Sequence, residues 1–467
     1  MTGHVRYAKK GCDQEMNGMR ESVIRVAGTL DRADLSYDGL VADLLAETYA
    51  RRSMDLSGLG PAGQAELITS RALNLIPGEE ALTALIAGGR PLVVKYGIDP
   101  TSPDVHLGHA VPIVLASRFQ RMGHRVVFII GDVTAKIGDP SGQAGDRPPL
   151  TDAEIAANLS TYQRQVSPFI DVGRAELRFN GSWLGEITLP RLLEIAARVP
   201  VSMSLQRDDF RNRLAAGTGL STAEFLYSIV MALDSVAITA DIELGGVDQL
   251  LNLQMCRKVM EVSGQVPELV VTTPLIEGTD GTGAKMSKSK GNYLALTASP
   301  DDVYGGIMSI PDRLTVPYLR SLTEWTDPEI AALGGQHPMA VKRLLAGDIV
   351  AALHGLEAAA AARAEFGARF SRRSFAGTRN LPELSLAASG TETLGTLLTR
   401  DLGFAESMNA LRRTAKGNGL RLVRETAAGQ ESEILPEEAV YRTLAEVAGD
   451  PEGLYVKAGR KVARIVR

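Results

Sequence analysis

Cysteine, long apolar runs and an excess of positive charge are all scarce in this sequence. The two cysteines, Cys12 and Cys256, exclude a framework of several disulfides and are compatible with a reducing compartment. No apolar run reaches the length that a bilayer requires. Residues 1–6 hold no signal-peptide core, so we expect a cytoplasmic protein. With a net charge of −5, nucleic-acid contacts would need local basic patches.

The composition that remains is that of a globular chain with several domains. Apolar residues make up 45% and charged residues 22% of 467 residues, which suffices for two or three domains. No internal repeat is found. Changes in pattern predict an N-terminal helical extension (1–65), a Rossmann-type domain (66–300), a helical domain (301–370), a linker (371–390) and a small mixed α+β domain (391–467).

Strands and helices alternate after residue 90 in a way that predicts a parallel sheet. Segments 92–96 and 125–131 are apolar, as buried strands are, and a helix over 106–122 separates them. Folds of this α/β class bind ligands where a strand hands over to a helix. The pattern also predicts helices at 151–170, 189–197, 223–233 and 351–369, and a strand at 236–244.

Two short strings carry residues suited to phosphate chemistry. In the string 106–109, His106 and His109 would face the same way at a helix N-terminus, where free N–H groups favour anions. Gly108 would let a nucleotide approach the backbone. In the glycine-flanked string 285–289, Lys285 and Lys288 could close over a pyrophosphate.

Each string alone also has a plainer interpretation. A His-x-x-His pair is compatible with a metal site or with two unrelated surface residues, and a Lys/Ser/Gly segment is usually a solvated loop. On one α/β chain, the two strings together predict ATP binding with attack at the α-phosphate, which needs positioning and charge neutralisation rather than covalent protein chemistry. A structural metal is not expected, because no ligand cluster accompanies the two cysteines.

From about residue 76 onward, the chain resembles the bacterial tyrosyl-tRNA synthetases, which are class I enzymes. The likeness is densest from 95 to 292. It is carried by the strings at 95–101, 106–109, 137–142, 180–183, 224–227, 241–249 and 285–289.

The resemblance implies activation of tyrosine by ATP and transfer to tRNA, with Mg²⁺ arriving on ATP, in a homodimer without membrane contact. It implies catalytic roles for Thr101, His106, His109, Lys285 and Lys288. It implies ATP binding by Gly97, Asp99, Gly108, Asp248, Gln249, Met286 and Ser287. It implies amino-acid binding by Thr134, Asp139, Asn180, Trp183, Tyr227, Met231, Asp234 and, again, Gln249.

Within that implied site, the buried polar groups have separate tasks. Asp234 would take the phenol hydroxyl of tyrosine, braced by Asn180 and Trp183, and Asp139 would lie near the α-ammonium. A charged ammonium in a dry pocket needs such acceptors. Taken without the resemblance, Asp234 is equally well a carboxylate at a helix end, and Tyr227 is more often plain core.

The final block resembles the small RNA-binding module that ends many of these enzymes. The resemblance implies that Arg412, Arg413, Lys416 and Arg421 face RNA phosphates. Positive and negative residues nearly balance in this block, which supports RNA binding only weakly.

Three positions depart from the family pattern. Met231, Leu233 and Val247 are apolar where the family usually has polar residues, and we expect all three near one pocket. They keep open a paralogue that activates a different amino acid or analogue for a biosynthetic pathway. A non-catalytic RNA-binding protein on the same scaffold is a further alternative, although the complete histidine and lysine sets argue against it.

Overall fold

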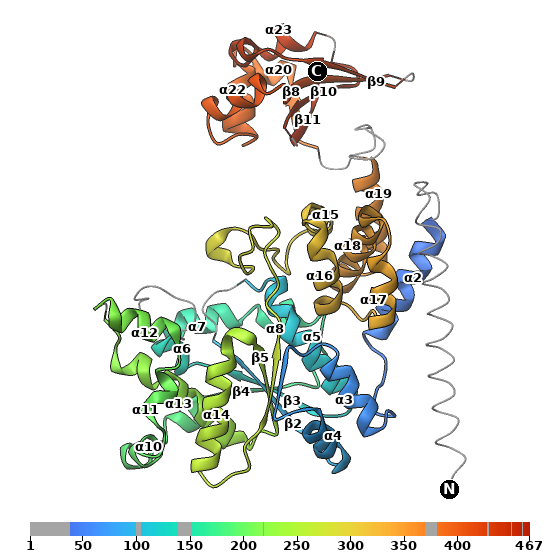
Figure 1. Cartoon of the computed structure of the whole chain (residues 1–467). Coiled ribbons are helices and arrows are strands. Elements are labelled where there is room, and N and C mark those ends of the chain that lie inside the picture. Colours follow the sequence, from blue (N-terminus) through green and yellow to red (C-terminus); the bar gives the residue numbers. More distant parts are fainter. Residues whose placement is uncertain are drawn as a thin grey trace. The chain divides into compact units, whose positions relative to one another are not determined.

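The computed structural model describes residues 38–99, 104–138, 151–217, 219–368, 381–426, 429–449, 451–459 and 461–467. The chain divides into two compact units, the first ending at Ala360 and the second beginning at Ala361 (Figure 1). Among the described helices, none combines the length and the apolarity that crossing a bilayer would require.

A six-stranded sheet forms the centre of the first unit. The strand order is β1-β6-β5-β2-β3-β4, and every pair is parallel except β1 with β6. The chain leaves β2 toward β3 on one side and returns through β5 on the other. The carboxyl ends of β2 and β5 therefore border a crevice of the kind in which such sheets bind ligands. The strands are β1 (Asn74–Ile76), β2 (Val93–Ile98), β3 (Arg125–Ile130), β4 (Glu176–Phe179), β5 (Ile242–Gly246) and β6 (Leu269–Thr273).

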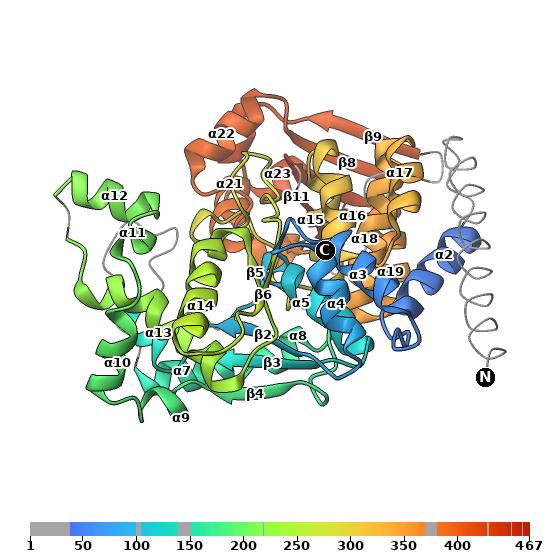
Figure 2. The ribbon, with the colours of Figure 1, turned by 60° about the horizontal axis from the view of Figure 1, so that its bottom comes forward.

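Helices cover both faces of this sheet, which confirms the predicted α/β class with a parallel-sheet core (Figures 1 and 2). Helix α5 (Leu107–Arg121) packs on one face. Helices α13 (Thr222–Ile238) and α14 (Leu250–Val262) cover the other, where Ile238 packs on Val93 and Val127. Nearly every residue of α5 is buried, as expected for a helix enclosed on all sides.

Shorter helices and a helical region complete the first unit. Those before β5 are α2 (Asp38–Arg51), α3 (Pro61–Thr69), α4 (Glu79–Ala87), α6 (Thr134–Ile137), α7 (Asp152–Leu159), α8 (Tyr162–Val166), α9 (Gly181–Leu184), α10 (Leu189–Ala196), α11 (Val201–Ser204) and α12 (Asp208–Ala215). Those after it are η1 (Val247–Gln249), η2 (Lys288–Lys290), α15 (Pro300–Ser309), η3 (Asp312–Leu314), α16 (Thr315–Leu322), α17 (Asp327–Gly334), α18 (Pro338–His354) and α19 (Leu356–Phe366), which contains the division point.

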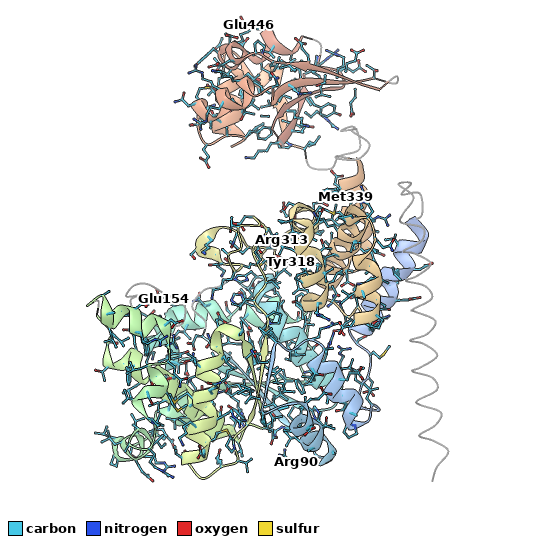
Figure 3. The ribbon with its side chains drawn as sticks, in the orientation of Figure 1. Arg90, Glu154, Arg313, Tyr318, Met339 and Glu446 are labelled. Carbon is cyan, nitrogen blue, oxygen red and sulfur yellow. The ribbon has the colours of Figure 1, made fainter. Side chains whose placement is uncertain are left out.

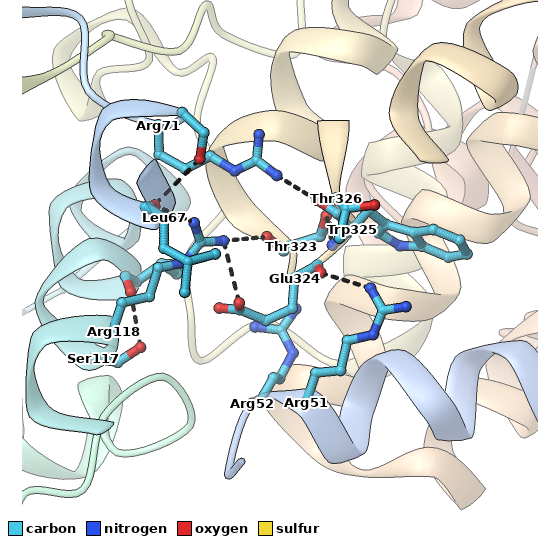
Figure 4. Close-up of polar contacts among 12 residues, drawn as sticks. Arg51, Arg52, Leu67, Arg71, Ser117, Arg118, Thr323, Glu324, Trp325 and Thr326 are labelled. Carbon is cyan, nitrogen blue, oxygen red and sulfur yellow. Dashed lines mark hydrogen bonds and ion pairs between the residues drawn. The ribbon is translucent and has the colours of Figure 1, made fainter. Parts of the chain in front are cut away.

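An arginine-rich network joins the C-terminal end of α5 to the helical region (Figure 4). Arg118 and Arg121 bind the carboxylate of Glu324 at 3.2 and 3.0 Å. From α2, Arg51 reaches across to Glu329 at 2.6 Å and also donates to the Glu324 carbonyl. The network thereby fixes one end of α5, the helix that carries the histidine string at its other end.

The second unit has a five-stranded sheet of order β7-β11-β10-β8-β9. Leu394, Leu398, Leu411 and Leu454 belong to its buried core. Its elements are β7 (Glu383–Ser385), α20 (Leu386–Ser389), α21 (Leu394–Thr396), η5 (Leu397–Asp401), α22 (Met408–Lys416), β8 (Leu420–Thr426), β9 (Gly429–Ile434), η6 (Glu437–Tyr441), α23 (Leu444–Ala448), β10 (Leu454–Ala458) and β11 (Lys461–Val466).

The structure corrects several predicted segments. The strand expected at 236–244 begins only at Ile242, because α13 runs on to Ile238 and ends at Thr239 in a left-handed conformation with φ of 52°. The helix expected at 351–369 is interrupted at Gly355, where φ is 89°. The one expected at 151–170 is split between α7 and α8. Residues 383–385, assigned to a linker, pair in parallel with β11 because Leu384 is buried there.

Candidate active site

A cleft of about 1190 Å³ opens where β2, β3 and β5 end. Residues from the start of α5, from the inner face of α13 and from the 285–289 string also line it. The structure thus brings together, in one cleft of the first unit, residues that lie almost two hundred positions apart in the sequence.

The two histidines of the first string form the N-terminus of α5. His106 is the N-cap, and its Nδ1 accepts the backbone N–H of Gly108 at 3.1 Å. The Nδ1 of His109 accepts the backbone N–H of His106 at 3.2 Å. The two rings lie 3.9 Å apart between centroids, and both residues line the cleft. The rings therefore cap the helix and border the site at once.

The same geometry fixes the charge and the tautomer of both histidines. Burial, together with the positive charge of Lys288, lowers the pKa of His106 to about 3 and that of His109 to about 4. Both rings are therefore neutral near pH 7. Because each Nδ1 accepts a hydrogen bond, the single ring proton sits on Nε2. Each histidine offers one Nε2–H donor, and the positive charge has to come from elsewhere.

Two glycines at the site serve different purposes. A Cβ on Gly97, at the end of β2, would meet no atom within 4 Å, so the cleft has open space beside this backbone. A Cβ on Gly108 would lie 2.9 Å from the His106 ring. Gly108 is therefore required because the His106 side chain folds over the helix start and leaves no room for a Cβ. This reason differs from the predicted one, which was the close approach of a nucleotide.

The lysines of the second string supply positive charge to the cleft. Lys285 Nζ lies 2.8 Å from the Asp248 carboxylate, and Lys288 donates to the carbonyl of Asp104. Met286 is buried, while Ser287 and Gln249 also line the cleft.

The base of this loop is anchored by Glu277, which bridges to Lys285 in antiparallel fashion. Arg313 binds both carboxylate oxygens of Glu277 at 2.6 Å, and Tyr318 donates to its carbonyl (Figure 3). The anchored base holds the two ammonium groups over the cleft.

A second polar group gathers around Asp99, directly after β2. Its carboxylate accepts from the Tyr227 hydroxyl at 2.7 Å and from the Thr134 hydroxyl at 2.8 Å. Because Tyr227 donates its proton to Asp99, its oxygen keeps lone pairs that can accept from a cation. Asp99, predicted on the ATP side, is thus hydrogen-bonded to two residues predicted for the amino acid.

Asp234 is a buried carboxylate that lines the cleft. Its oxygens accept from Trp183 Nε1 at 2.8 Å and from Asn180 Nδ2 at 3.3 Å, and Asn180 also reaches Thr134 at 3.1 Å. Burial raises the pKa of Asp234 to about 6, against the opposing influence of the Lys95 charge and of these two hydrogen bonds. Asp234 lies inside α13, one turn before its end, rather than at a helix terminus.

The three apolar departures, which were expected near one pocket, take different places around the cleft. Met231 lines the cleft together with Tyr227 and Asp234. Leu233 packs instead into an apolar cluster between α13 and α14. Val247 lies in η1, outside the cleft lining.

The remaining predicted residues belong to the second unit or fall outside the described structure. Thr101 and Asp139 fall outside the described residues. In the second unit, Arg412 is paired with Glu437 at 2.6 Å, and Arg421 bonds the carbonyl of Asn418 at 3.0 Å. Arg413 and Lys416 are the exposed members of that set.

Sequence reasoning missed two features beside the site. Gly131, after β3, lines the cleft, and a Cβ there would lie 1.9 Å from an Asp99 oxygen. Lys95 and Glu243, both on buried strands, form an ion pair of 2.7 Å at the floor of the cleft, which Glu243 lines. The signal was available, since a charged residue inside an apolar strand needs a buried partner.

Comparison with known proteins gives consistent matches. The family model described as "tRNA synthetases class I (W and Y)" matches residues 87–371. The tyrosine–tRNA ligase of Thermotoga maritima is 41% identical over 366 residues, which cover 77% of this chain and 90% of that protein. The tyrosine–tRNA ligase of Aquifex aeolicus is 38% identical over 86% of this chain and 97% of its own length.

Solved structures agree in fold. A C-terminally truncated mitochondrial tyrosyl-tRNA synthetase of Aspergillus nidulans superposes with a TM-score of 0.55 at 21% identity, covering 71% of this chain and 99% of that one.

Proposed function

This chain belongs to the class I tRNA synthetases of the W and Y type, and on that premise we propose that its cleft activates tyrosine with ATP and that the tyrosyl group is then passed to tRNA. It is an aminoacyl-tRNA ligase by family and uses ATP. The observation that carries the choice of tyrosine is Asp234, a buried carboxylate braced by Trp183 and Asn180 in the same cleft as the phosphate donors. A buried acceptor of this kind suits a phenol hydroxyl.

In the proposed reaction, the carboxylate of tyrosine attacks the α-phosphorus of ATP and pyrophosphate leaves. The carboxylate is already a nucleophile, so no side chain has to remove a proton. Negative charge grows on the departing phosphates, where His106 and His109 donate from Nε2–H and Lys285 and Lys288 supply positive charge. Mg²⁺ comes with ATP as part of that substrate.

The other contacts of the cleft divide between the two substrates. Gly97 leaves room for the nucleotide, and Asp248 is placed for a ribose hydroxyl once Lys285 turns to phosphate. The Asp99, Thr134 and Tyr227 group suits the α-ammonium of the amino acid. Arg413 and Lys416 of the second unit are the exposed cations that we assign to tRNA phosphates. A homodimer and a cytoplasmic location belong to the same proposal.

The test is ATP–pyrophosphate exchange with the full chain across the common amino acids and a set of tyrosine analogues. Strong exchange with tyrosine alone is the expected result. Selective exchange with another compound would contradict the choice of tyrosine and support a repurposed synthetase. The comparisons with known proteins give no support to that alternative or to a non-catalytic protein.

Replacing Met231 by glutamine is expected to tighten tyrosine binding by about tenfold, because an amide in the cleft adds a hydrogen bond toward the charged ammonium. The measurement is the dissociation constant for tyrosine by calorimetry. Met339→Gln, on an exposed methionine of α18 (Figure 3), is the matched control and should leave it unchanged. Equal affinities for wild type and Met231→Gln would mean that the ammonium is held entirely by other groups.

A further inference from the structure

An array of charged residues in mutual contact lies at the floor of the cleft, in the layer between the sheet and helices α13 and α14. Lys95 of β2 is fully buried, and its Nζ lies 2.7 Å from Glu243 Oε1 and 2.8 Å from Ser235 Oγ. Ser235 in turn donates to Glu268 at 2.9 Å. The array meets the amino-acid side of the cleft at two points, because Ser235 follows Asp234 directly on α13 and Glu243 itself lines the cleft.

The array resembles a metal site in composition, but its cation position is filled. Glu243, Cys256 and Glu268 gather within 4.8 Å of one another through one atom each. The Lys95 ammonium contacts Glu243 and lies 3.9 Å from Cys256 Sγ. Burial works to lower the pKa of Lys95, but the surrounding acidic groups outweigh it and keep the ammonium charged.

The two carboxyl groups of the array, on Glu243 and Glu268, lie close together in the buried layer. Glu243 Oε2 and Glu268 Oε2 are both buried without a hydrogen-bond partner among the described residues. Burial and the nearby charge of Glu243 raise the pKa of Glu268 well above its ordinary value. A proton on Glu268 would supply the missing donor between the two groups. Lys95 and Glu243 then cancel in charge, and Asp234 stands beside a nearly neutral array.

We propose that the array of Lys95, Glu243 and Glu268 sets the charge carried by Asp234, and through it the hydrogen bond that separates a phenol from a phenyl side chain. The inference rests on the proposed function. Lys95 does not line the cleft, so it acts through Asp234 and serves as a positioning residue. Its positive charge favours the ionised Asp234, and the charge of Glu243 disfavours it. Trp183 and Asn180, which also face Asp234, are neutral donors.

Further titratable groups surround this part of the cleft. Cys256 of α14 stays a neutral thiol, because burial raises its pKa. Asp99 is hydrogen-bonded to Tyr227 and Thr134, and Asp132 accepts the backbone N–H of Gly181. None of these is changed by the substitutions below.

Opposite substitutions in the array test the proposal. Lys95→Met removes the positive charge, and the double variant Glu243→Gln with Glu268→Gln removes the negative charge while keeping the shapes. The double variant removes both acidic groups together, so that neither can replace the charge of the other. The measurement is kcat and KM for tyrosine and for phenylalanine in ATP–pyrophosphate exchange from pH 5 to 9.

For the wild type, the KM for tyrosine should rise as the pH falls through about 6, where Asp234 gains a proton. Lys95→Met should move this rise to higher pH and increase the KM for tyrosine at pH 7 by about tenfold. The double variant should move it to lower pH. The KM for phenylalanine should stay flat in every variant, and kcat should change little.

The proposal would be overturned if the rise in the KM for tyrosine moved in the same pH direction in both variants. It would also be overturned if the variants lost stability while this rise stayed at the same pH. The array would then be only a structural ion pair. If Lys95→Met does not fold, the double variant alone tests the proposal, through the shift of the rise in KM to lower pH. A wild type without tyrosine exchange would refute the proposed function, and the inference with it. Normal exchange with tyrosine, without opposite pH shifts of the KM rise in the two variants, would refute the inference only.

Discussion

Lys285→Ala is expected to slow adenylate formation by about 10²- to 10³-fold while leaving the affinity for tyrosine nearly unchanged. The reason is that both histidines of the cleft are neutral, with pKa values lowered to about 3 and about 4. They donate hydrogen bonds but carry no charge. The charge that grows on pyrophosphate in the transition state therefore falls to the lysines, whose contribution is absent from the ground-state complex with tyrosine.

The measurement is single-turnover formation of the adenylate, with the dissociation constant for tyrosine determined in parallel. Lys290→Ala is the matched control, because Lys290 lies in the same loop, is exposed and does not line the cleft. His109→Ala should follow the pattern of Lys285→Ala. A loss of tyrosine affinity as large as the loss of rate would show that Lys285 acts on the folded cleft and not on the leaving group.

Glu324→Gln is expected to destabilise the first unit by about 3–5 kcal/mol, because it leaves two buried guanidinium groups without their carboxylate. Arg118 and Arg121 both bind Glu324, and all three side chains are less than one-tenth exposed. The measurement is urea unfolding at pH 7 followed by tryptophan fluorescence. Both tryptophans, Trp183 and Trp325, lie in the first unit, so the signal reports on that unit.

The same pair of arginines makes the stability depend on pH. Although burial opposes ionisation, Arg118 and Arg121 lower the pKa of Glu324 to about 2 from an ordinary value of 4.5. The contribution of Glu324 is therefore complete above pH 4.5 and is lost as the pH falls toward 2. Wild type should lose stability across this window more steeply than Glu324→Gln. Glu357→Gln, on an exposed residue of α19, is the control and should change stability by less than about 0.5 kcal/mol.

What the sequence predicted well follows from local rules. The start of α5 was placed within one residue, because a helix that begins at His106 is marked by a preceding turn and a following apolar run. The buried strand β3 was recognisable from an unbroken apolar run, and β2 from an apolar segment that only Lys95 interrupts. The two motif strings also needed no knowledge of long-range contacts to be recognised.

The features that the sequence did not predict depend on the direction in which a side chain points and on contacts between residues that are far apart in the chain. Positions 227, 231 and 234 recur on one face of α13, whereas position 233 points to α14, so proximity in sequence misplaced Leu233. The helix α13 runs beyond its predicted end at residue 233 to Ile238, which packs on Val93 of the sheet. The ion pair of Lys95 with Glu243 joins two strands far apart in the chain, so the sequence shows that Lys95 needs a buried partner but not which residue provides it.

The start of α5 depends on the same two histidines for the stability of the helix and for the proposed catalysis. The ring nitrogens that cap this helix belong to the same side chains that border the cleft, and Gly108 is shaped around one of them. A substitution at His106 or His109 therefore frays the helix as well as impairing the chemistry. A descendant of this protein that abandoned adenylation would still be under selection to keep both rings, so the persistence of this motif in a lineage is weaker proof of activity than the persistence of Lys285.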